Sequence, residues 1–531
     1  MNKIATYLNQ HLLGDVSGAK TLRKHFSTDA SVLTITPEIV AFPRVTNDIR
    51  KIARFTWQLA EKGHVLGVTV RGGGGDETGG AIGKGVLVDT SPYLRNIITI
   101  AAKDRLVHVQ PGVTFSTLNQ TLKWQGLALA QVGADAATVG GAIASGDLGA
   151  SGYVGDAIEK LEIVLANGDI IETGRLSKRE LSKKLGEQTL EGEIYRRLEG
   201  LIEDNDAIIS EIAADTHQDN TGYRRISAVK QKDGSFDLTP LFIGSQGTLG
   251  IISEVVLKAD FYSQDKTCIA LTTDSRELAR DVADTISDLQ PSTLTILDGD
   301  TFRTAVKQGA EFTALGDVSQ LGAVVYIELN DFNDRVQANK LKRIRKYINK
   351  LAVGIIDSTT HSADEFSVIK DVRHGAAVTS ADDHAPIPLL NGASIPANRR
   401  EEFETAFAEL AKKHHTELSV EVAALTGTYT ISSPLKLSTV SDKQKLFRLL
   451  TDYADLVLKS DGSLLGTGAE GRVKANAALA LLSEGEQSLH EQIRTIFDPF
   501  GTLNPGVKQK ADIRTIVAAL RSSYDVDNLI R

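Results

Sequence analysis

Apolar residues recurring every three to four positions predict helices in three stretches of the chain. Between residues 47 and 63 such a set repeats over four turns, with Asn47 at the N-cap position and Gly63 after the last turn. A basic amphipathic helix is predicted near 335–351, and the leucines of 441–459 mark one face of another. These segments should each bury one side against a sheet or a neighbouring helix.

Shorter runs that are continuously apolar or that alternate with polar residues predict strands. They include VLGVTV (65–70), RLVHVQ (105–110) and KLEIVLANG (160–168) in the first half of the chain. Further runs at 268–274 and 323–329 are separated by helix-prone segments. This strand–helix alternation indicates an antiparallel sheet covered by helices in the second half.

The chain has 531 residues, which is too long for one compact core. The texture of the pattern changes near residue 260 and again near residue 485. We therefore predict an α+β protein in three parts, with residues 1–260 as a first domain and 261–485 as a second. Residues 486–531 are expected to return to the first domain.

Composition removes several classes of function. A net charge of −9 with interspersed signs gives no basic footprint for nucleic acid. The single cysteine, Cys268, excludes an internal disulfide and is expected to be a small core residue. No apolar run approaches the length of a transmembrane helix, and residues 1–15 lack the features of a signal peptide. We expect a cytoplasmic protein without a transmembrane segment.

The run VRGGGGDETGG (70–80) carries the clearest chemistry. Four glycines directly after a predicted strand let the backbone approach a ligand and turn its N–H groups toward an anion such as a pyrophosphate. The G-x-G-x-x-G register fails at Thr78, and the P-loop pattern fails because Gly85 follows Gly83-Lys84. On this motif alone, a flexible surface hairpin remains an equal alternative.

Other motifs resemble those of one family and appear in its order. They are FSTDASVLTITPEIVAFPRVTNDI (26–49), GVLVDTSPYLRNI (85–97), HVQPGVTFSTLNQTL (108–122), GADAATVGGAIASGDLGASGYVGDAIEKLEIVLANGDI (133–170), NTGYRRI (220–226), LFIGSQGTLGIISEVVLKAD (241–260) and FDPFGTLNPGVK (497–508). Together they resemble the FAD-linked oxidase family, whose FAD-binding domain is of the vanillyl-alcohol-oxidase or PCMH type. The resemblance implies an FAD domain of two α+β subdomains, over residues 1–260, and an α+β cap.

The resemblance also implies which residues meet FAD. The glycine loop would wrap the pyrophosphate, a second group would line the other side of the cofactor, a third would meet the adenine end, and one residue would lie toward the flavin ring. In that order they are Arg71, Gly72, Gly73, Gly74, Gly75, Asp76, Glu77 and Thr78; Thr138, Gly140, Gly141 and Ser145, with Gly155 at a close-approach turn; Gly250 and Ile252; and Asn504. We expect non-covalent FAD, because Gly75 stands where tethering members place a histidine and Cys268 lies outside these motifs.

Within that family, the chain most resembles the branch of the D-2-hydroxyacid dehydrogenases and glycolate oxidase subunits. That branch holds a divalent metal beside the substrate hydroxyl with the histidines and glutamate of H-x-G-D-G-N-x-H and G-E-H-G-x-G-R motifs. The corresponding stretches here are ALTGTYT and GSLLGTGAEGRVK. Ala423 and Thr430 replace two histidines, and Thr467 and Gly468 replace the Glu-His pair. We therefore expect no metal ion.

Substrate residues are less well marked. Arg373 matches a family arginine that binds a substrate carboxylate, a task that suits its planar guanidinium. His374 and His384 are candidate bases because imidazole titrates near neutrality. Arg472 and Lys474 are candidates for holding an anionic substrate, with a solvated surface as the alternative. Arg373, His374 and Arg472 are taken as the catalytic set.

Two further interpretations concern side-chain direction. Glu470 and Tyr429 lie within the altered motifs and are candidates for facing the flavin. His414-His415, which follows two lysines, is expected on a solvated helix face.

The predicted function is an FAD-dependent oxidoreductase that moves hydride from a small substrate to flavin N5, with hydroxylated and anionic molecules as the candidate substrates. One alternative is a D-lactate-like 2-hydroxyacid dehydrogenase that uses a base without metal. Others are an alcohol or sugar oxidase, and an FAD-binding subunit without substrate chemistry of its own. The electron acceptor would be a quinone, a partner protein or oxygen, and the chain could form a homodimer.

Overall fold

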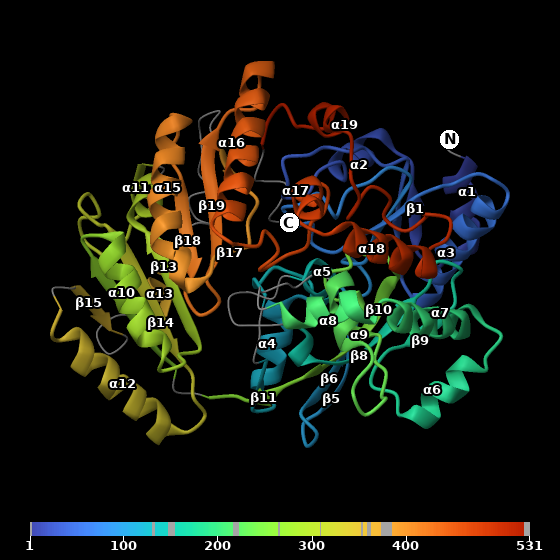
Figure 1. Cartoon of the computed structure of the whole chain (residues 1–531), viewed down its shortest axis with the longest axis horizontal. Coiled ribbons are helices and arrows are strands. Elements are labelled where there is room, and N and C mark those ends of the chain that lie inside the picture. The colour runs from blue at the N-terminus through green and yellow to red at the C-terminus, as the bar shows by residue number, and fades with distance from the viewer. Residues whose placement is uncertain are drawn as a thin grey trace.

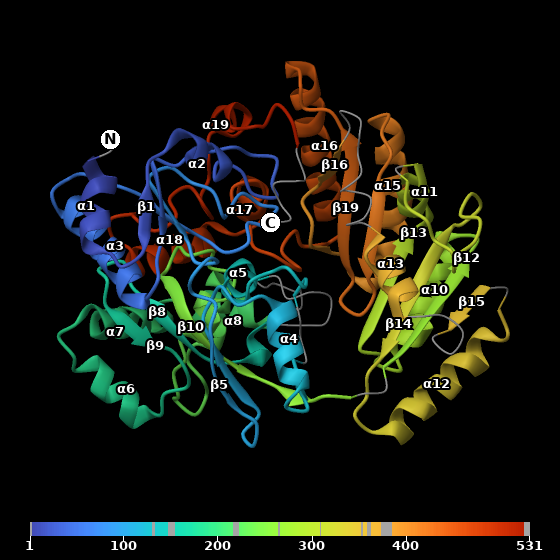
Figure 2. The ribbon, with the colours of Figure 1, turned by 180° about the vertical axis from the view of Figure 1, so that it is seen from behind.

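The computed structural model describes residues 3–129, 133–146, 154–215, 222–263, 266–307, 309–351, 354–357, 363–372 and 385–524. These residues form two lobes that stand side by side (Figures 1 and 2). The first lobe contains the N-terminal elements and the last stretch of the chain. The second lobe is built on the largest sheet. Within the described residues, no helix is both long and apolar enough to cross a bilayer.

A four-stranded sheet opens the first lobe. Its order is β1 (Asp15–Ser17), β2 (Ile39–Phe42), β4 (Val86–Asp89) and β3 (Val68–Arg71), with β2 and β3 parallel to β4. The accompanying helices are α1 (Lys3–His11), α2 (Lys20–His25) and α3 (Thr46–Glu61). Strand β3 ends at Arg71, paired with Asp89, so the glycine run begins where the strand stops.

Helix α3 corrects one detail of the sequence prediction. It begins at Thr46, and its N-cap residue is Val45, which makes no side-chain cap; Asn47 therefore lies inside the first turn rather than at the cap. The polar residue that anchors this end is the buried Asp48. Its carboxylate accepts hydrogen bonds from the N–H groups of Leu13, Gly14 and Arg44 at 2.9 to 3.0 Å. A negative side chain in the first turn also complements the helix dipole.

A five-stranded antiparallel sheet forms the rest of the first lobe. Its order is β5 (Ile97–Ala101), β6 (Leu106–Val109), β10 (Ile251–Lys258), β8 (Ile158–Val164) and β9 (Ile170–Glu172), and a separate pair joins β7 (Leu127–Ala128) to β11 (Asp260–Phe261). The helices here are α4 (Phe115–Lys123), α5 (Val139–Ser145), α6 (Lys178–Leu185), α7 (Leu190–Asp204), α8 (Asp206–Ala214), α9 (Thr239–Phe242) and the 3-10 turns Val154–Ala157 and Tyr223–Ala228. The predicted strands at 105–110 and 160–168 are thus confirmed within a few residues.

The second lobe is the predicted antiparallel sheet covered by helices. Its strands run in the order β15 (Gly354–Asp357), β12 (Thr267–Thr273), β14 (Ala323–Leu329), β13 (Thr293–Asp298), β18 (Ser419–Ala423), β19 (Thr428–Leu435) and β16 (Ala385–Pro388), with β17 (Ala393–Ser394) paired to β19. Its helices are α10 (Arg276–Ser287), α11 (Gly299–Lys307), α12 (Asp334–Ile348), α13 (Ala363–Lys370), α15 (Arg400–Lys413) and α16 (Val440–Lys459).

Both faces of this sheet are apolar, which explains its nearly continuous hydrophobic strands. Ile296 belongs to the core to which α10, α12, α15 and α16 contribute, whereas its neighbour Leu297 belongs to the core of α11 and α13 on the other face. Successive residues of a strand point to opposite faces, so each run has to serve two cores. Cys268 is 9% exposed and belongs to the second of these cores, as expected.

After α16 the chain crosses back to the first lobe through α17 (Ala475–Ala480), α18 (Glu484–Phe497) and α19 (Ile513–Ala518) (Figure 1). Leu489 and Ile493 of α18 join the core of the five-stranded sheet. The boundaries near 260 and 485 stay predictions. Strand β10 ends at Lys258 and β12 begins at Thr267, while the return to the first lobe starts earlier than 485, since Arg472 already bonds to Gly79.

Candidate active site

The glycine loop after β3 leaves open space where a ligand could lie. A Cβ added to Gly75 would meet no atom within 4 Å, and one added to Gly73 would meet only the Ala136 carbonyl, at 3.5 Å. Gly74 is required for two reasons: its φ is +77°, and a Cβ would stand 2.1 Å from the Arg71 guanidinium. The backbone here fits the close approach of a diphosphate.

Arg71 anchors the start of this loop. It is 6% exposed, and its Nη1 donates to the Thr28 carbonyl at 2.5 Å. Burial lowers its pKa, while nearby Asp29 and Asp89 act in the opposite sense. Burial, reinforced by the neighbouring Asp76, raises the pKa of Asp29 to about 6. The loop therefore sits on a buried group of opposite charges rather than on the surface.

Asp76 folds the second half of the loop back on itself. Its Oδ1 accepts from the N–H of Thr78 at 2.7 Å, the Thr78 hydroxyl at 2.7 Å and the N–H of Gly80 at 3.0 Å. The N–H groups of Thr78 and Gly80 are therefore taken by the protein, which leaves the first half of the loop to face a ligand. Glu77 points to the other lobe, where its carboxylate accepts from Asn391 Nδ2.

Helix α5 closes against the loop from the second subdomain. Thr138 is its N-cap and accepts from Gly141 N–H at 3.3 Å. A Cβ on Gly72 would lie 2.0 Å from Thr138 Oγ1, so the loop and the helix start are in direct contact. A Cβ on Gly140 would lie 2.5 Å from Pro111 Cβ. Ser145 ends the helix, and its carbonyl accepts from Ala469 N–H at 2.7 Å.

The remaining expected cofactor residues lie on other elements of the second subdomain. Gly155 lies in the turn Val154–Ala157. Gly250 packs onto β8, where a Cβ would meet Ile163 at 2.4 Å, and Ile252 is paired with Ile163 in the sheet. Of the predicted FAD residues, the structure thus brings the glycine loop into contact with Thr138 at the start of α5, and this contact is the cofactor junction.

Asn504, expected toward the flavin ring, has its amide fully engaged by protein. Its Nδ2 donates to the carbonyls of Gly80 at 2.8 Å and Gln246 at 2.7 Å, and its Oδ1 accepts from Thr69 Oγ1 at 3.0 Å. It is fully buried with φ +40°. Its described contacts hold the glycine loop to residues 497–508, the closing segment.

Arg472 has a similar setting. Its guanidinium donates to the carbonyls of Gly79 and Pro505, and burial lowers its pKa to about 10. Lys474 is 2% exposed and donates to the carbonyls of Asn391 and Leu464. Neither is on a solvated face. Arg373, His374 and His384 lie outside the described residues.

Two expected flavin-facing side chains turn elsewhere. Tyr429 is wrong as a flavin contact: strand alternation turns it to the face covered by α15, where its hydroxyl donates to Glu404 at 3.0 Å and its ring packs on Phe403. Glu470 forms a buried ion pair with Lys508. Burial alone would raise the pKa of Glu470, but the neighbouring Lys508 ammonium holds this pKa below its usual value.

The residues at the four expected metal positions do not fit a divalent ion. Ala423 offers a methyl group and lies diagonally across the β18–β19 pair from Thr430. Gly468 offers no side chain, and Thr467 offers only a hydroxyl. The N–H of Thr467 donates to the Gly392 carbonyl and that of Gly468 to the Gly146 carbonyl. Imidazole and carboxylate, the usual ligands of such ions, are missing from all four positions. The described part of the chain contains no cluster of three or more His, Cys, Asp or Glu that could hold a metal.

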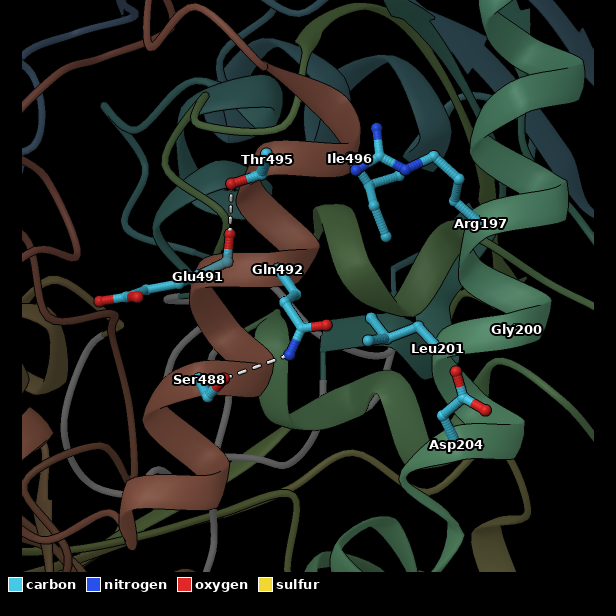
Figure 3. A pocket seen from close by; sticks show the side chains of 9 residues that line it. All are labelled: Arg197, Gly200, Leu201, Asp204, Ser488, Glu491, Gln492, Thr495 and Ile496. Carbon is cyan, nitrogen blue, oxygen red and sulfur yellow. Dashed lines mark hydrogen bonds between the residues drawn. The ribbon is translucent and has the colours of Figure 1, made fainter.

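Two surface hollows lie apart from this junction. One, of about 400 Å³, runs between α7 and α18, where Figure 3 shows Arg197 and Leu201 opposite Gln492 and Ile496. The other, of about 550 Å³, lies between the end of α15 and α16 and includes His414. Neither is lined by a residue of the glycine loop.

The expectation of a solvated face is wrong for His414. Its side chain is only 9% exposed, and its Nε2 lies 2.7 Å from Asp452 Oδ2. Packing of α16 against α15 covers it, which the spacing within 412–415 could not reveal.

Residues that the sequence interpretation missed include Asp29, Gln246 and Asn391. Asp29 lies in the motif 26–49 and Gln246 in the motif 241–260, but nothing in these motifs distinguishes either residue from its neighbours. Asn391 lies between β16 and β17, outside every motif. Their importance comes from contacts hundreds of residues apart in the chain.

Comparison with known proteins gives the family. A model described as "FAD binding domain" matches residues 37–174, and one described as "FAD linked oxidases, C-terminal domain" matches residues 263–507. D-2-hydroxyglutarate dehydrogenase of Pantoea ananatis is 25% identical over 99% of this chain and 54% of its own length. Glycolate oxidase subunit GlcD of Bacillus subtilis is 24% identical over 91% of this chain and 92% of its own. The chain spans about half the length of the D-2-hydroxyglutarate dehydrogenases that it matches.

Solved structures agree on the fold. p-Cresol methylhydroxylase with substrate bound superposes with a TM-score of 0.70 at 13% identity, covering 96% of each chain. 4-Ethylphenol oxidase from Gulosibacter chungangensis gives 0.69 at 14%, covering 96% of this chain and 97% of the other. The first lobe is thus a PCMH-type FAD-binding domain and the second its cap. With both family models matched in order, the chain belongs to the FAD-linked oxidase family.

Proposed function

We propose that this chain is an FAD-dependent oxidoreductase that removes hydride from a hydroxyl-bearing carbon of a small substrate. The observation that carries the proposal is the open backbone cradle at Gly73 and Gly75, held against the start of α5 and facing no protein side chain. The bound FAD would supply the two-electron acceptor at flavin N5, and the chain would supply binding, orientation and exclusion of water.

The proposed cofactor contacts follow the two sides of the junction. Backbone N–H groups of the first half of the glycine loop, with Arg71 behind them, would hold the diphosphate. Thr138, Gly140, Gly141 and Ser145 would line the second side, and Gly155, Gly250 and Ile252 the adenine end. Asp76, Thr78, Arg472 and Asn504 would act by holding the loop in shape. FAD would be non-covalent, since Gly75 offers no side chain and Cys268 is buried in the cap.

The substrate is proposed to be a small hydroxy acid. Relatives named for D-2-hydroxyglutarate and glycolate support this class. Arg373 would pair with the carboxylate, and His374 would accept the hydroxyl proton. The four expected metal positions offer neither imidazole nor carboxylate; they are Ala423, Thr430, Thr467 and Gly468. The base would therefore act without a metal, as in the D-lactate-like alternative.

Two other functions remain open. The first is an alcohol or sugar oxidase with the same fold. An FAD-binding subunit without substrate chemistry is favoured by the replacement of every metal-site position. We propose that the electron acceptor is a quinone, a partner protein or oxygen. The chain is further proposed to form a homodimer and to act in the cytoplasm.

The deciding experiment is an anaerobic titration of the FAD-loaded protein. D-2-hydroxy acids should bleach the flavin absorption near 450 nm within seconds, and EDTA or added Mn²⁺ should leave the rate unchanged. Bleaching by alcohols or sugars alone would favour the oxidase. Absence of bleaching by every substrate, with dithionite still reducing the flavin, would favour the subunit without its own chemistry.

The same sample tests how the flavin is held. Acid precipitation should release all yellow colour into the supernatant, because no tether is expected. A yellow pellet would contradict non-covalent binding. A purified protein that stays colourless after incubation with FAD would overturn the proposal itself.

A further inference from the structure

Gln246 lies in the turn between α9 and β10. Four separated segments meet there: α5, the closing segment, the glycine loop and the segment that contains Gly471. It is 6% exposed, and its backbone φ is +51°, a conformation that few residues other than glycine adopt. A non-glycine residue persists there only where its surroundings determine it. The contacts of Gln246 show what determines it.

Its backbone joins two of the four segments. The N–H donates to the Ala144 carbonyl of α5 at 2.8 Å, and the carbonyl accepts from Asn504 Nδ2 at 2.7 Å. Asn504 in turn donates to the Gly80 carbonyl at 2.8 Å. Helix α5, the closing segment and the end of the glycine loop are thereby fixed to one turn.

Its side chain joins the other two. Nε2 donates to Asp76 Oδ2 at 3.0 Å and to Thr78 Oγ1 at 2.9 Å, and Oε1 accepts from Gly471 N–H at 2.8 Å. A Cβ on Gly80 would lie 2.4 Å from Nε2, so the glycine makes room for this amide. Every polar atom of Gln246 is thus engaged by protein.

We propose that Gln246 is the positioning residue that shapes the glycine loop for the FAD diphosphate, acting through Asp76 and Thr78 and without touching the cofactor. The inference rests on the proposed function for the presence of FAD in that loop. It adds the residue that keeps the first half of the loop open by fixing the second half.

The chemistry requires an amide. The position needs a donor toward the Asp76 carboxylate and an acceptor toward Gly471 N–H, and among uncharged side chains of this length an amide has both. A carboxylate in its place would keep the acceptor but would face Asp76 with a like charge. An alanine would leave the Gly471 N–H and part of Asp76 without partners, at a cost in free energy.

These differences define two variants. Gln246→Ala should weaken FAD binding to the apoprotein by about tenfold or more, measured by flavin fluorescence at pH 7.5. Gln246→Glu should weaken binding at pH 8 and regain affinity toward pH 5.5, because the two facing carboxylates take up a proton. The charged groups around this position are Asp76, Asp29, Arg71, Arg472 and the Glu470–Lys508 pair, all of which are also present in the unchanged protein used as reference.

Gln337→Ala is the matched control. Gln337 is also 6% exposed and bonds to a backbone N–H and a threonine hydroxyl, but in the cap. It should leave FAD affinity unchanged while lowering the melting temperature of the apoprotein.

The outcomes separate the two proposals. If the unchanged protein binds no FAD, the proposed function fails. If it binds FAD and both Gln246 variants bind equally well, the role of Gln246 is overturned. A Gln246→Glu variant that is weakened equally at every pH would contradict the action through Asp76, even if Gln246→Ala fails to fold.

Discussion

His490 is a histidine that the protein keeps neutral. It lies on α18, 6% exposed, with its ring against Tyr223 at a centroid distance of 5.3 Å and near the Glu470–Lys508 pair. Burial lowers its pKa to about 3 from 6.5, outweighing the attraction of Glu470. At the scale of single residues, this core therefore contains one buried ion pair, Glu470–Lys508, but disfavours protonation of His490 beside it.

This gives a pH dependence of known sign. Because the folded-state pKa is depressed, the unfolded chain takes up the proton first, and stability falls as pH drops from 6.5 toward 3. His490→Phe should remove this loss of stability. The free energy of unfolding of the variant minus that of the unchanged protein should therefore be about 2 kcal/mol larger at pH 5 than at pH 7.5. Urea unfolding of the apoprotein at several pH values measures it. The exposed His64→Phe should keep the original slope, and an identical slope in both variants would contradict the assignment.

At the scale of elements, α5 shows how much a short helix depends on what it packs against. Its sequence, VGGAIAS, contains two adjacent glycines that lower helix propensity, yet Gly140 is required because Pro111 stands where a Cβ would lie. A helix in this position is kept by its neighbours rather than by its own residues.

Substituting two helical glycines tests this point. Gly140→Ala should displace α5 from Pro111, weaken FAD binding by about tenfold and lower the melting temperature, since overpacking costs about 1 to 3 kcal/mol. Gly200→Ala in α7, where a Cβ would meet nothing within 4 Å, should stabilise by about 0.5 to 1 kcal/mol and leave FAD binding unchanged. Equal FAD affinity in Gly140→Ala would show that α5 does not line the cofactor.

The elements were the most predictable part of this protein. Period and glycine spacing located β3, the glycine loop and α16 within a few residues, because these signals are local. Side-chain direction was less accessible. Tyr429 and Thr430 are adjacent in sequence but on opposite faces, and Asn504 could not be known to bond to Gly80, because no local pattern encodes a contact across 424 residues.

On the scale of the whole molecule, residues 520–524 bond back to residues 29–33, between α2 and β2. Arg521 donates to the carbonyls of Asp29 and Leu33, and Tyr524 donates to that of Ala30 at 2.5 Å. Leu33 and Leu520 also form a β-bridge. The segment behind Arg71 is therefore held from the far end of the chain.

Removing these contacts should lower the free energy of unfolding of the apoprotein. Arg521→Ala leaves two buried carbonyls without donors and should destabilise the apoprotein by about 2 to 3 kcal/mol, measured by urea unfolding. Arg514→Ala on the exposed side of α19 should have little effect. If the two variants unfold at the same urea concentration, these C-terminal contacts carry no stability.

The reach of Arg472 back to Gly79 has a consequence for synthesis of the chain. Strand β3 and the glycines leave the ribosome early, but the loop lacks the donor to Gly79 until residue 472 has emerged and the donor to Gly80 until residue 504 has. The nascent N-terminal domain would meet FAD with an unfinished loop, so the cofactor should load only after residue 504 has left the ribosome rather than guide the first folding steps.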